Sequence, residues 1–268
     1  MTAHTLIESF NLANKEKRPA LLTYTVGGDP NKELSLELYK TIANSGADVI
    51  EVGLGHSANV GDGPAIQDCT YRALSNGIKN DDVFEIIKKF KSQFKTEIII
   101  MTYRNKIMRY GEDKFIEKCV SSAVSGLIVV DYPFPTNQSF ANKCKMNNII
   151  FIQLIAPTTK EERLKKIIKE SHEVLYLMSM SGVTGEKLKS SSDLINDKLR
   201  SIKSIDPDKK IILGFGITLE NISNFKNLDA CVVGSAICKK ITDSIEKNID
   251  PISEIKKMIS NLKEKISS

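Results

Sequence analysis

Residues 48–67 read DVIEVGLGHSANVGDGPAIQ, an apolar run that passes directly into a glycine-rich loop. The run from Val49 to Leu54 has the length and the β-branched content of a buried strand. One carboxylate, Glu51, interrupts it, and the loop carries a second, Asp62. Because burying an ionised carboxylate is costly unless the group is paired or used, two interpretations are open. Glu51 forms an ion pair with a neighbouring strand, or it is a general acid or base whose pKa is raised by apolar surroundings while Asp62 stays ionised.

Seven more apolar runs of this kind lie along the chain, and amphipathic helical segments separate them. These predicted strands are Ala20–Val26, Glu97–Tyr103, Gly126–Asp131, Ile149–Ile155, Val174–Met180, Lys210–Phe215 and Ala230–Gly234. Continuous apolar strands are typical of parallel sheets, because both faces of such a sheet are covered. Eight strands alternating with helices over roughly 250 residues predict a closed (β/α)8 barrel, the TIM-barrel fold of the α/β class. No linker or low-complexity tract divides the chain, so we expect one domain over residues 1–268.

Composition excludes several classes of function. The net charge of +5 comes from dispersed lysines, and only 6% of the residues are aromatic, so nucleic-acid binding is not expected. No apolar run approaches the roughly 18 residues that would cross a membrane, and no basic leader precedes an apolar segment. The five cysteines form no C-x-x-C pair and there are three histidines, so we expect reduced thiols in the cytoplasm and no metal site.

Glycine motifs follow the last two predicted strands. A closed barrel brings the carboxyl ends of its strands to one face, where catalytic residues gather. Gly214-Phe215-Gly216 follows the seventh strand, and Gly234-Ser235 follows the eighth and opens a helix. Each motif alone is also compatible with a tight turn, but the two together favour a phosphate site, because glycines and a helix N-terminus suit an anion. Ser181–Gly185 is either a lid with glycine hinges or an ordinary polar loop.

Apolar side chains at the strand ends predict a pocket beside these motifs. The candidates are Met101, Ile128, Leu154, Tyr176 and Phe215, each of which alone would equally be read as core. Together with two carboxylates and a phosphate site they predict an amphipathic phosphorylated substrate. No lysine interrupts a strand to form a Schiff base, and no carboxylate and histidine set suits a metal. We therefore expect acid–base chemistry by carboxylates, without a cofactor, on a substrate that supplies its own electron sink.

An ordered set of motifs resembles one known family. The matching segments are Gly28-Asp29-Pro30, Ala47–Gly53, Asp62–Gln67, Met101-Thr102-Tyr103, Arg109-Tyr110-Gly111, Gly126–Val129 with Asp131, Ala156-Pro157-Thr158, Gly182–Gly185, Gly214–Ile217 and Val233–Ile237. In these segments the chain resembles the α subunit of tryptophan synthase over essentially its whole length.

The resemblance implies a lyase of tryptophan biosynthesis that cleaves indole-3-glycerol phosphate to indole and glyceraldehyde 3-phosphate by a retro-aldol step. It implies that Glu51 is the catalytic glutamate and that Asp62 holds the indole N–H. The expected substrate-binding residues are Tyr24, Met101, Tyr103, Ile128, Tyr176, Thr184 and Phe215, and the expected phosphate-binding residues are Gly185, Gly216, Gly234 and Ser235. It also implies a partner, the pyridoxal-phosphate-dependent β subunit, in an α2β2 assembly.

Two loops depart from the family pattern. Where the family usually reads GIPFSDPLADGP, residues 53–64 read GLGHSANVGDGP, and residues 104–107 read RNKI in place of YNPI. In the family both loops face the β subunit. Three hypotheses follow: an active lyase with a co-adapted β partner, a catalytically weak subunit that mainly binds and activates its partner, or a stand-alone indole-releasing lyase. We favour the first, because Glu51 and Asp62 are retained. His56 either fills the space of the missing phenylalanine or titrates near neutral pH.

Overall fold

A parallel barrel forms the centre of the computed structural model, which describes residues 2–178, 191–214, 216–225 and 228–268. Its strands are β1 (Ala20–Val26), β2 (Val49–Gly53), β3 (Glu97–Thr102), β4 (Gly126–Val129), β5 (Ile150–Phe151), β6 (Gln153–Ile155), β7 (Val174–Met178), β8 (Lys210–Gly214) and β9 (Ala230–Val233). They follow the order β5-β4-β3-β2-β1-β9-β8-β7-β6, and every pairing is parallel.

The barrel closes through β5 and β6, which together form its fifth strand. Only Ile152 separates the two, and its backbone N–H still donates to the carbonyl of Leu127 in β4 at 2.8 Å. β5 pairs with β4, and β6 pairs with β7, so the ladder passes from one neighbour to the other at this break. The predicted (β/α)8 barrel and its eight strands are confirmed. Several strands end one or two residues earlier than predicted, because the last residues already turn into the loops at the carboxyl end of the barrel.

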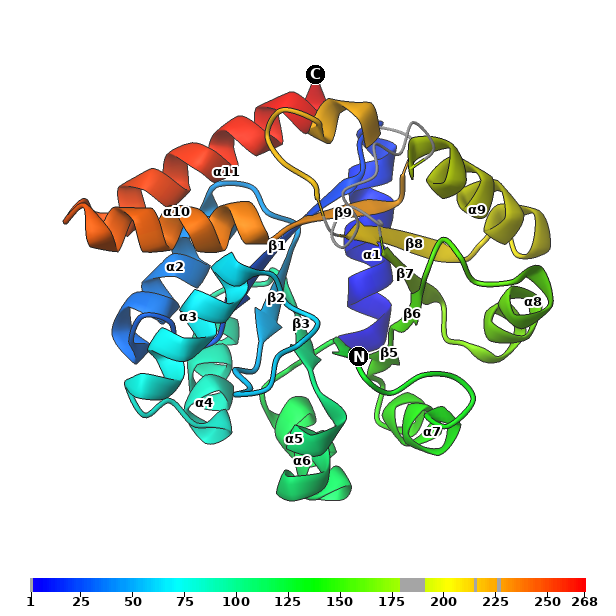
Figure 1. Ribbon diagram of the computed structural model, residues 1–268, viewed down its shortest axis with the longest axis horizontal. Helices are drawn as coiled ribbons and strands as arrows, with labels where there is room; N and C mark the ends of the chain where they lie inside the picture. The colour runs from blue at the N-terminus through cyan, green and yellow to red at the C-terminus, as the bar shows by residue number, and fades with distance from the viewer. Residues whose placement is uncertain (1, 179–190, 215, 226–227) are drawn as a thin grey trace.

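Helices surround the strands, as Figure 1 shows. They are α1 (Thr2–Lys15), α2 (Lys32–Asn44), α3 (Pro64–Ser75), α4 (Asn80–Lys91), α5 (Arg104–Tyr110), α6 (Glu112–Ser121), α7 (Gln138–Met146), α8 (Glu161–Glu170), α9 (Ser191–Ile205), α10 (Ser235–Glu246) and α11 (Pro251–Ser267), with a 3-10 turn at Ile222–Phe225. Among the described helices none is sufficiently long and apolar to cross a membrane.

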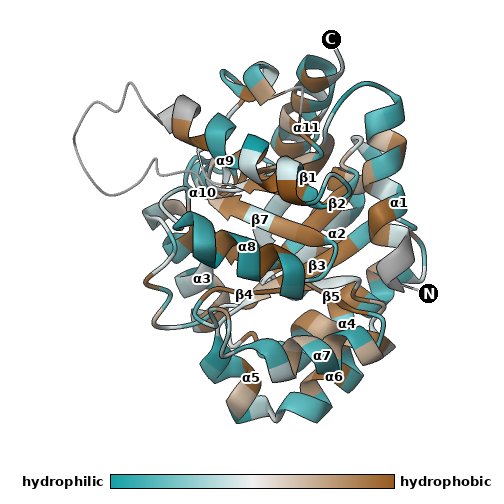
Figure 2. Cartoon of the chain, turned by 90° about the vertical axis from the view of Figure 1, so that its right-hand side faces the viewer, coloured by the Kyte–Doolittle hydropathy of each residue, from teal (hydrophilic) through white to brown (hydrophobic). Residues whose placement is uncertain are grey.

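Both faces of the sheet are buried, which explains the continuous apolar strands. Outward-facing residues such as Leu21, Ile50 and Ile100 pack under the surrounding helices. Inward-facing residues fill the barrel, where Leu22, Val49 and others are joined by Leu6 and Phe10 of α1. Figure 2 shows the same layering, with apolar strands inside and polar faces on the outer helices. In α1 the apolar side chains pack against residues near the amino ends of the strands, so the helix closes that end.

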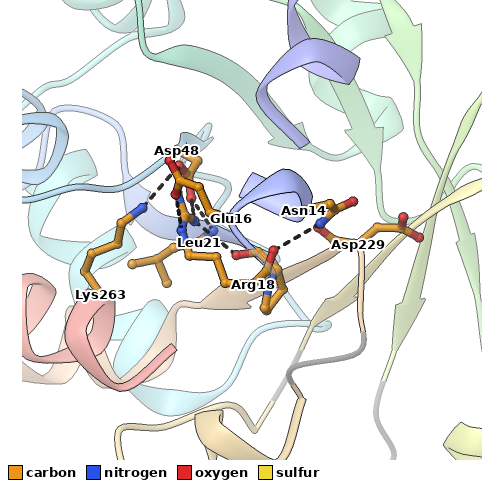
Figure 3. A network of polar contacts seen from close by, with 8 residues as sticks. Asn14, Glu16, Arg18, Leu21, Asp48, Asp229 and Lys263 are labelled. Carbon is orange, nitrogen blue, oxygen red and sulfur yellow. Dashed lines mark hydrogen bonds and ion pairs between the residues drawn. The ribbon is translucent and has the colours of Figure 1, made fainter. Parts of the chain in front are cut away.

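A polar network ties the elements together at the amino end of the barrel (Figure 3). Arg18, which is 5% exposed, donates to both carboxylate oxygens of Asp48 at 2.6 and 2.9 Å. Asp48 also accepts from the backbone of Leu21 at 2.7 Å and from Lys263 of α11 at 3.3 Å. One aspartate thereby joins the entry of β1, the entry of β2 and the last helix.

Candidate active site

Glu51 lies inside the barrel and is fully buried. It is in register with Tyr24 on β1 and Ile99 on β3, whose side chains also belong to the barrel interior. Neither oxygen of its carboxyl group has a hydrogen-bond partner within the described residues. Burial raises the pKa of Glu51 to about 8, and the nearby charge of Asp62 adds to the rise. The described part of the chain supplies no ion pair for Glu51, so the structure favours the acid–base interpretation, with Glu51 protonated at neutral pH.

Asp62 lies at the end of the loop that follows β2, directly before α3, and is half-buried. Burial raises its pKa, whereas hydrogen bonds from the side chains of Asn59 and Tyr103 and the charge of His56 lower it. Glu51 has none of these lowering contributions. Asp62 is therefore the more acidic of the two groups, and the environments push the two pKa values apart, as in sites where two carboxyl groups take different roles.

Two buried tyrosines lie near Glu51, and each leans over a glycine of the next strand. A Cβ atom at Gly53 of β2 would overlap the hydroxyl of Tyr24, and one at Gly214 of β8 would overlap the hydroxyl of Tyr176. Burial raises the pKa of both tyrosines well above its ordinary value, and the charge of Glu51 contributes in both cases. Glycine at these two positions leaves room for a phenol ring at the carboxyl end of the barrel.

Tyr103 anchors the loop that carries Asp62. Its hydroxyl accepts a hydrogen bond from the backbone N–H of Gly61 at 3.2 Å and donates to Asp62. Burial and the charge of Asp62 raise the pKa of Tyr103 to about 12, so the phenol keeps its proton. The ring of His56 packs on Tyr103 with a centroid distance of 5.2 Å, and its Nδ1 accepts from the backbone of Ala58 at 2.9 Å. His56 fills space beside Tyr103 in this arrangement.

The apolar residues predicted for the pocket also face the barrel interior. Met101 on β3 and Ile128 on β4 are partners in register and are 8% and 0% exposed. Half-buried Leu154 packs against the same interior cluster. Phe215 and Thr184 lie outside the described residues. The described pocket residues thus lie between Glu51 and the loops at the carboxyl end of the barrel. An aromatic ring bound there would contact apolar side chains.

Two of the predicted phosphate loops open at the same end of the barrel. Gly234 caps α10, and the exposed Ser235 is the first residue of that helix, so backbone N–H groups at the helix N-terminus are available to an anion. Gly216 has a φ of 73°, which favours glycine, and its carbonyl accepts from the side chain of Asn221 at 2.8 Å. Gly185 lies outside the described residues.

Four residues shape this site in ways that sequence reasoning did not assign. Gly53 and Gly214 make room for the tyrosines. Because alternate residues of a strand point to the same face of the sheet, counting along each strand would have placed both glycines beside an aromatic ring. Asn59 acts on Asp62, and Lys106 donates to the carbonyl of Gly55 at 2.6 Å. No spacing signal identifies these last two, because each depends on how a loop without regular structure folds back.

Comparisons with known proteins agree on one family. A family profile described as tryptophan synthase alpha chain matches residues 10–267. The tryptophan synthase alpha chain of Pelagibacter ubique is 47% identical over 260 residues, covering 97% of this chain and 98% of the relative, and that of Petrotoga mobilis is 36% identical over 91% and 95%.

Solved structures give the same result. Tryptophan synthase subunit alpha from Legionella pneumophila superposes with a TM-score of 0.88 at 28% identity, and 98% of each chain is covered. A chain of the α2β2 tryptophan synthase complex of Pyrococcus furiosus superposes with a TM-score of 0.82 at 33% identity, covering 92% of this chain and 98% of that one.

Proposed function

The chain belongs to the tryptophan synthase alpha chain family, and from this premise we propose that Glu51 and Asp62 carry out its reaction. The protein is a lyase of tryptophan biosynthesis that cleaves indole-3-glycerol phosphate, and it works in an α2β2 complex with the β subunit. The observation that supports the role of Glu51 is its fully buried carboxyl group, which has no hydrogen-bond partner in the described residues and a pKa of about 8.

Glu51 donates one proton and then accepts another. As a carboxylic acid it donates a proton to C3 of the indole ring, and as the resulting carboxylate it takes the proton of the hydroxyl group on the adjoining glycerol carbon. The bond between these two carbons breaks, its electron pair restores the aromatic indole, and the hydroxyl-bearing carbon becomes an aldehyde. No further reactant is needed, and Glu51 ends in its starting form. A pKa near neutrality suits a group that must both give and accept a proton.

Asp62 binds the indole N–H. Protonation of C3 places positive charge on the ring nitrogen, so a carboxylate that accepts this N–H bond stabilises the transition state more than the ground state. Asp62 suits this role because hydrogen bonds from Asn59 and Tyr103 favour its ionised form. We assign Tyr24, Met101, Tyr103, Ile128, Tyr176, Thr184 and Phe215 to the binding of the rest of the substrate. Gly185, Gly216, Gly234 and Ser235 bind the phosphate through backbone and hydroxyl donors.

The decisive test is indole release by Glu51→Gln and Asp62→Asn in the purified chain and in its complex with the β subunit. Acid–base groups contribute about 10²- to 10⁴-fold, so we expect Glu51→Gln to lower kcat by at least about 10²-fold with a smaller change in KM. Glu97→Gln is the matched control, because Glu97 is also a buried strand carboxylate but pairs with Lys91 and Ser125. Wild-type kcat in Glu51→Gln would contradict the proposal.

We place the protein in the cytoplasm, supported by the five cysteines, all of which are free and buried thiols. We also treat residues 1–268 as one domain, supported by the parallel pairing of β1 with β9, which joins the first strand to the last in one sheet.

A further inference from the structure

Lys106 is a half-buried lysine on α5 whose ammonium group donates to a backbone carbonyl. Its Nζ lies 2.6 Å from the carbonyl oxygen of Gly55, at the start of the loop that leads from β2 to Asp62. No carboxylate within the described residues pairs with it, and burial together with the charge of Arg109 lowers its pKa. Holding an unpaired ammonium group at such a place is costly, so the contact with Gly55 requires an explanation beyond surface solvation.

The same helical turn holds the other end of that loop. Tyr103 caps α5 and its hydroxyl accepts from the N–H of Gly61, while the N–H of Lys106 bonds to the carbonyl of Tyr103 at 3.0 Å. Tyr103 and Lys106 are therefore fixed relative to each other. The start of α5 thus contacts the loop at Gly55 and at Gly61, on either side of the five residues between them.

The other contacts of the loop are local: His56 packs on Tyr103, the N–H of Ala58 donates to His56, and the side chain of Asn59 bonds to Asp62. Most residues between Gly55 and Asp62 are exposed or half-buried, and Val60 is 89% exposed. A glycine at each end adds backbone freedom that must be lost when the loop is ordered. At Gly61 the approach is close, because a Cβ atom there would lie 3.2 Å from the Tyr103 hydroxyl and 3.1 Å from Val130, so these neighbours would have to shift by a few tenths of an ångström. The contacts with Tyr103 and Lys106 thus tie this exposed loop, which leads to Asp62, to the start of α5.

Lys106 also lines a cleft outside the barrel mouth. The cleft has a volume of about 450 Å³, and Gly55, His56, Arg109 and Tyr110 contribute to its walls. Lys106 is half-buried where it lines this cleft. A charged donor makes a stronger hydrogen bond to a carbonyl than a neutral one, so Lys106 is the firmer of the two anchors.

We propose that Lys106 is a positioning residue that fixes the loop of residues 55–61 through the carbonyl of Gly55 and so holds Asp62 in place for the indole N–H. The inference rests on the proposed role of Asp62. Lys106 itself touches no reacting atom. Its effect on the rate comes from geometry, since a displacement of about 1 Å in a binding group can cost about 10²-fold in rate.

The test compares Lys106→Met, Lys106→Arg and a matched control, Lys209→Met. Lys209 is likewise buried and donates to backbone carbonyls, those of His172 at 2.9 Å and Ser171 at 3.2 Å, but it lies at the amino end of β8. We expect Lys106→Met to lower kcat at least tenfold with a smaller change in KM, Lys106→Arg to restore most of the loss, and Lys209→Met to keep wild-type kcat and KM. Amide hydrogen exchange in residues 55–63 should speed up at least tenfold in Lys106→Met alone.

A double-mutant cycle tests whether Lys106 acts through Asp62. In an Asp62→Asn background, Lys106→Met should add less than a twofold loss, because the group that it positions has already been changed. A full additional tenfold loss would overturn the inference. Wild-type kcat in Lys106→Met, or unchanged amide hydrogen exchange in residues 55–63, would also overturn it. If Asp62→Asn leaves no measurable rate, the hydrogen-exchange result decides. If Glu51→Gln and Asp62→Asn keep activity, the proposed function fails, and that result is separate from the behaviour of Lys106.

Discussion

At the scale of single residues, the chemistry depends on a carboxyl group that the fold keeps neutral. Glu51 has apolar neighbours in the barrel, and burial rather than a specific partner raises its pKa to about 8. Asp62, a short way along the same chain segment, has three polar neighbours that favour its charge. One barrel mouth thus holds an acid and an anion at the same pH, a division of roles that environment alone produces.

This difference predicts the pH dependence of kcat/KM for indole-3-glycerol phosphate cleavage. The protonated form of Glu51 starts the reaction, so the rate should be half-maximal near pH 8 and fall about tenfold for each further pH unit. On the acidic side the rate should fall as Asp62 becomes protonated, at a pH above the ordinary range of an aspartate because burial raises its pKa. Steady-state rates between pH 4 and 10 check both limbs. A rate that stays constant or rises from pH 8 to 9.5 would count against a protonated Glu51.

The same pKa makes a prediction about stability. Between pH 4.5 and about pH 8 the folded state keeps a proton on Glu51 that the unfolded chain has lost, so the free energy of unfolding should fall as pH rises through this range. Glu51→Gln has no such proton to lose. Its stability relative to wild type should grow from pH 5 to pH 8, on a scale of about 1.4 kcal/mol for each pKa unit, and then level off.

Urea unfolding of both proteins at several pH values measures this difference. The exposed Glu37 of α2 offers a control, because Glu37→Gln should track wild type at every pH. A gap between wild type and Glu51→Gln that is constant with pH would mean that the folded state does not raise the pKa of Glu51.

At the scale of elements, hydrophobic pattern predicted the strands well because both of their faces are buried. Each apolar run became a barrel strand, and the fifth strand is interrupted at Ile152, directly before Gln153, the one polar residue of its run. Glu51 was found because a carboxylate inside such a run is conspicuous, and Asp62 because it is the carboxylate of the glycine-rich loop that follows. The roles of Lys106 and Asn59 were not found, because the loop of residues 55–61 has no periodic pattern from which the neighbours of a side chain can be predicted.

The elements at the amino end of the barrel should affect stability without affecting activity. Arg18→Met leaves Asp48 without its bidentate partner in a mostly buried place, and we expect a loss of about 2 to 3 kcal/mol. In a chain of this size that lowers the unfolding midpoint by roughly 4 to 10 °C. kcat and KM should stay at wild-type values, because Arg18 and Asp48 lie at the end of the strands opposite to the loop of Asp62.

Thermal unfolding and indole-release kinetics of the same samples test this separation. Lys143→Met is the matched control, because Lys143 pairs with Glu112 and Asp113 at the surface and such pairs are worth about 0 to 1 kcal/mol. If Arg18→Met lost activity while remaining folded, the two ends of the barrel would be coupled and the separation proposed here would be wrong.

At the scale of the whole molecule, closing the barrel is what brings distant segments to one mouth. Glu51, Tyr176 and Ser235 are far apart in sequence, yet each stands on or directly after a strand at the same end. Barrel topology made this gathering predictable once the strands were counted. The rim is less predictable, since its loops differ from the family pattern at residues 55–61 and 104–106, and α5 supplies anchors to the first of them.

The altered rim leads to a prediction about the β subunit. The loop of residues 55–61 is largely exposed, and the contacts that hold it and Asp62 come from within the loop, from Tyr103 and from Lys106. A partner that packs on this loop removes its remaining freedom before substrate binds, which is the condition for positive coupling. We expect slow indole release by the chain alone and a rise of at least tenfold when the β subunit from the same organism is added, with no rise in Glu51→Gln.

Equal rates of indole release with and without the β subunit would instead identify a stand-alone lyase. No indole release in either condition, with the β reaction still stimulated, would identify a subunit kept for binding, and in that case restoring rigidity to residues 55–61 should be the change that returns activity.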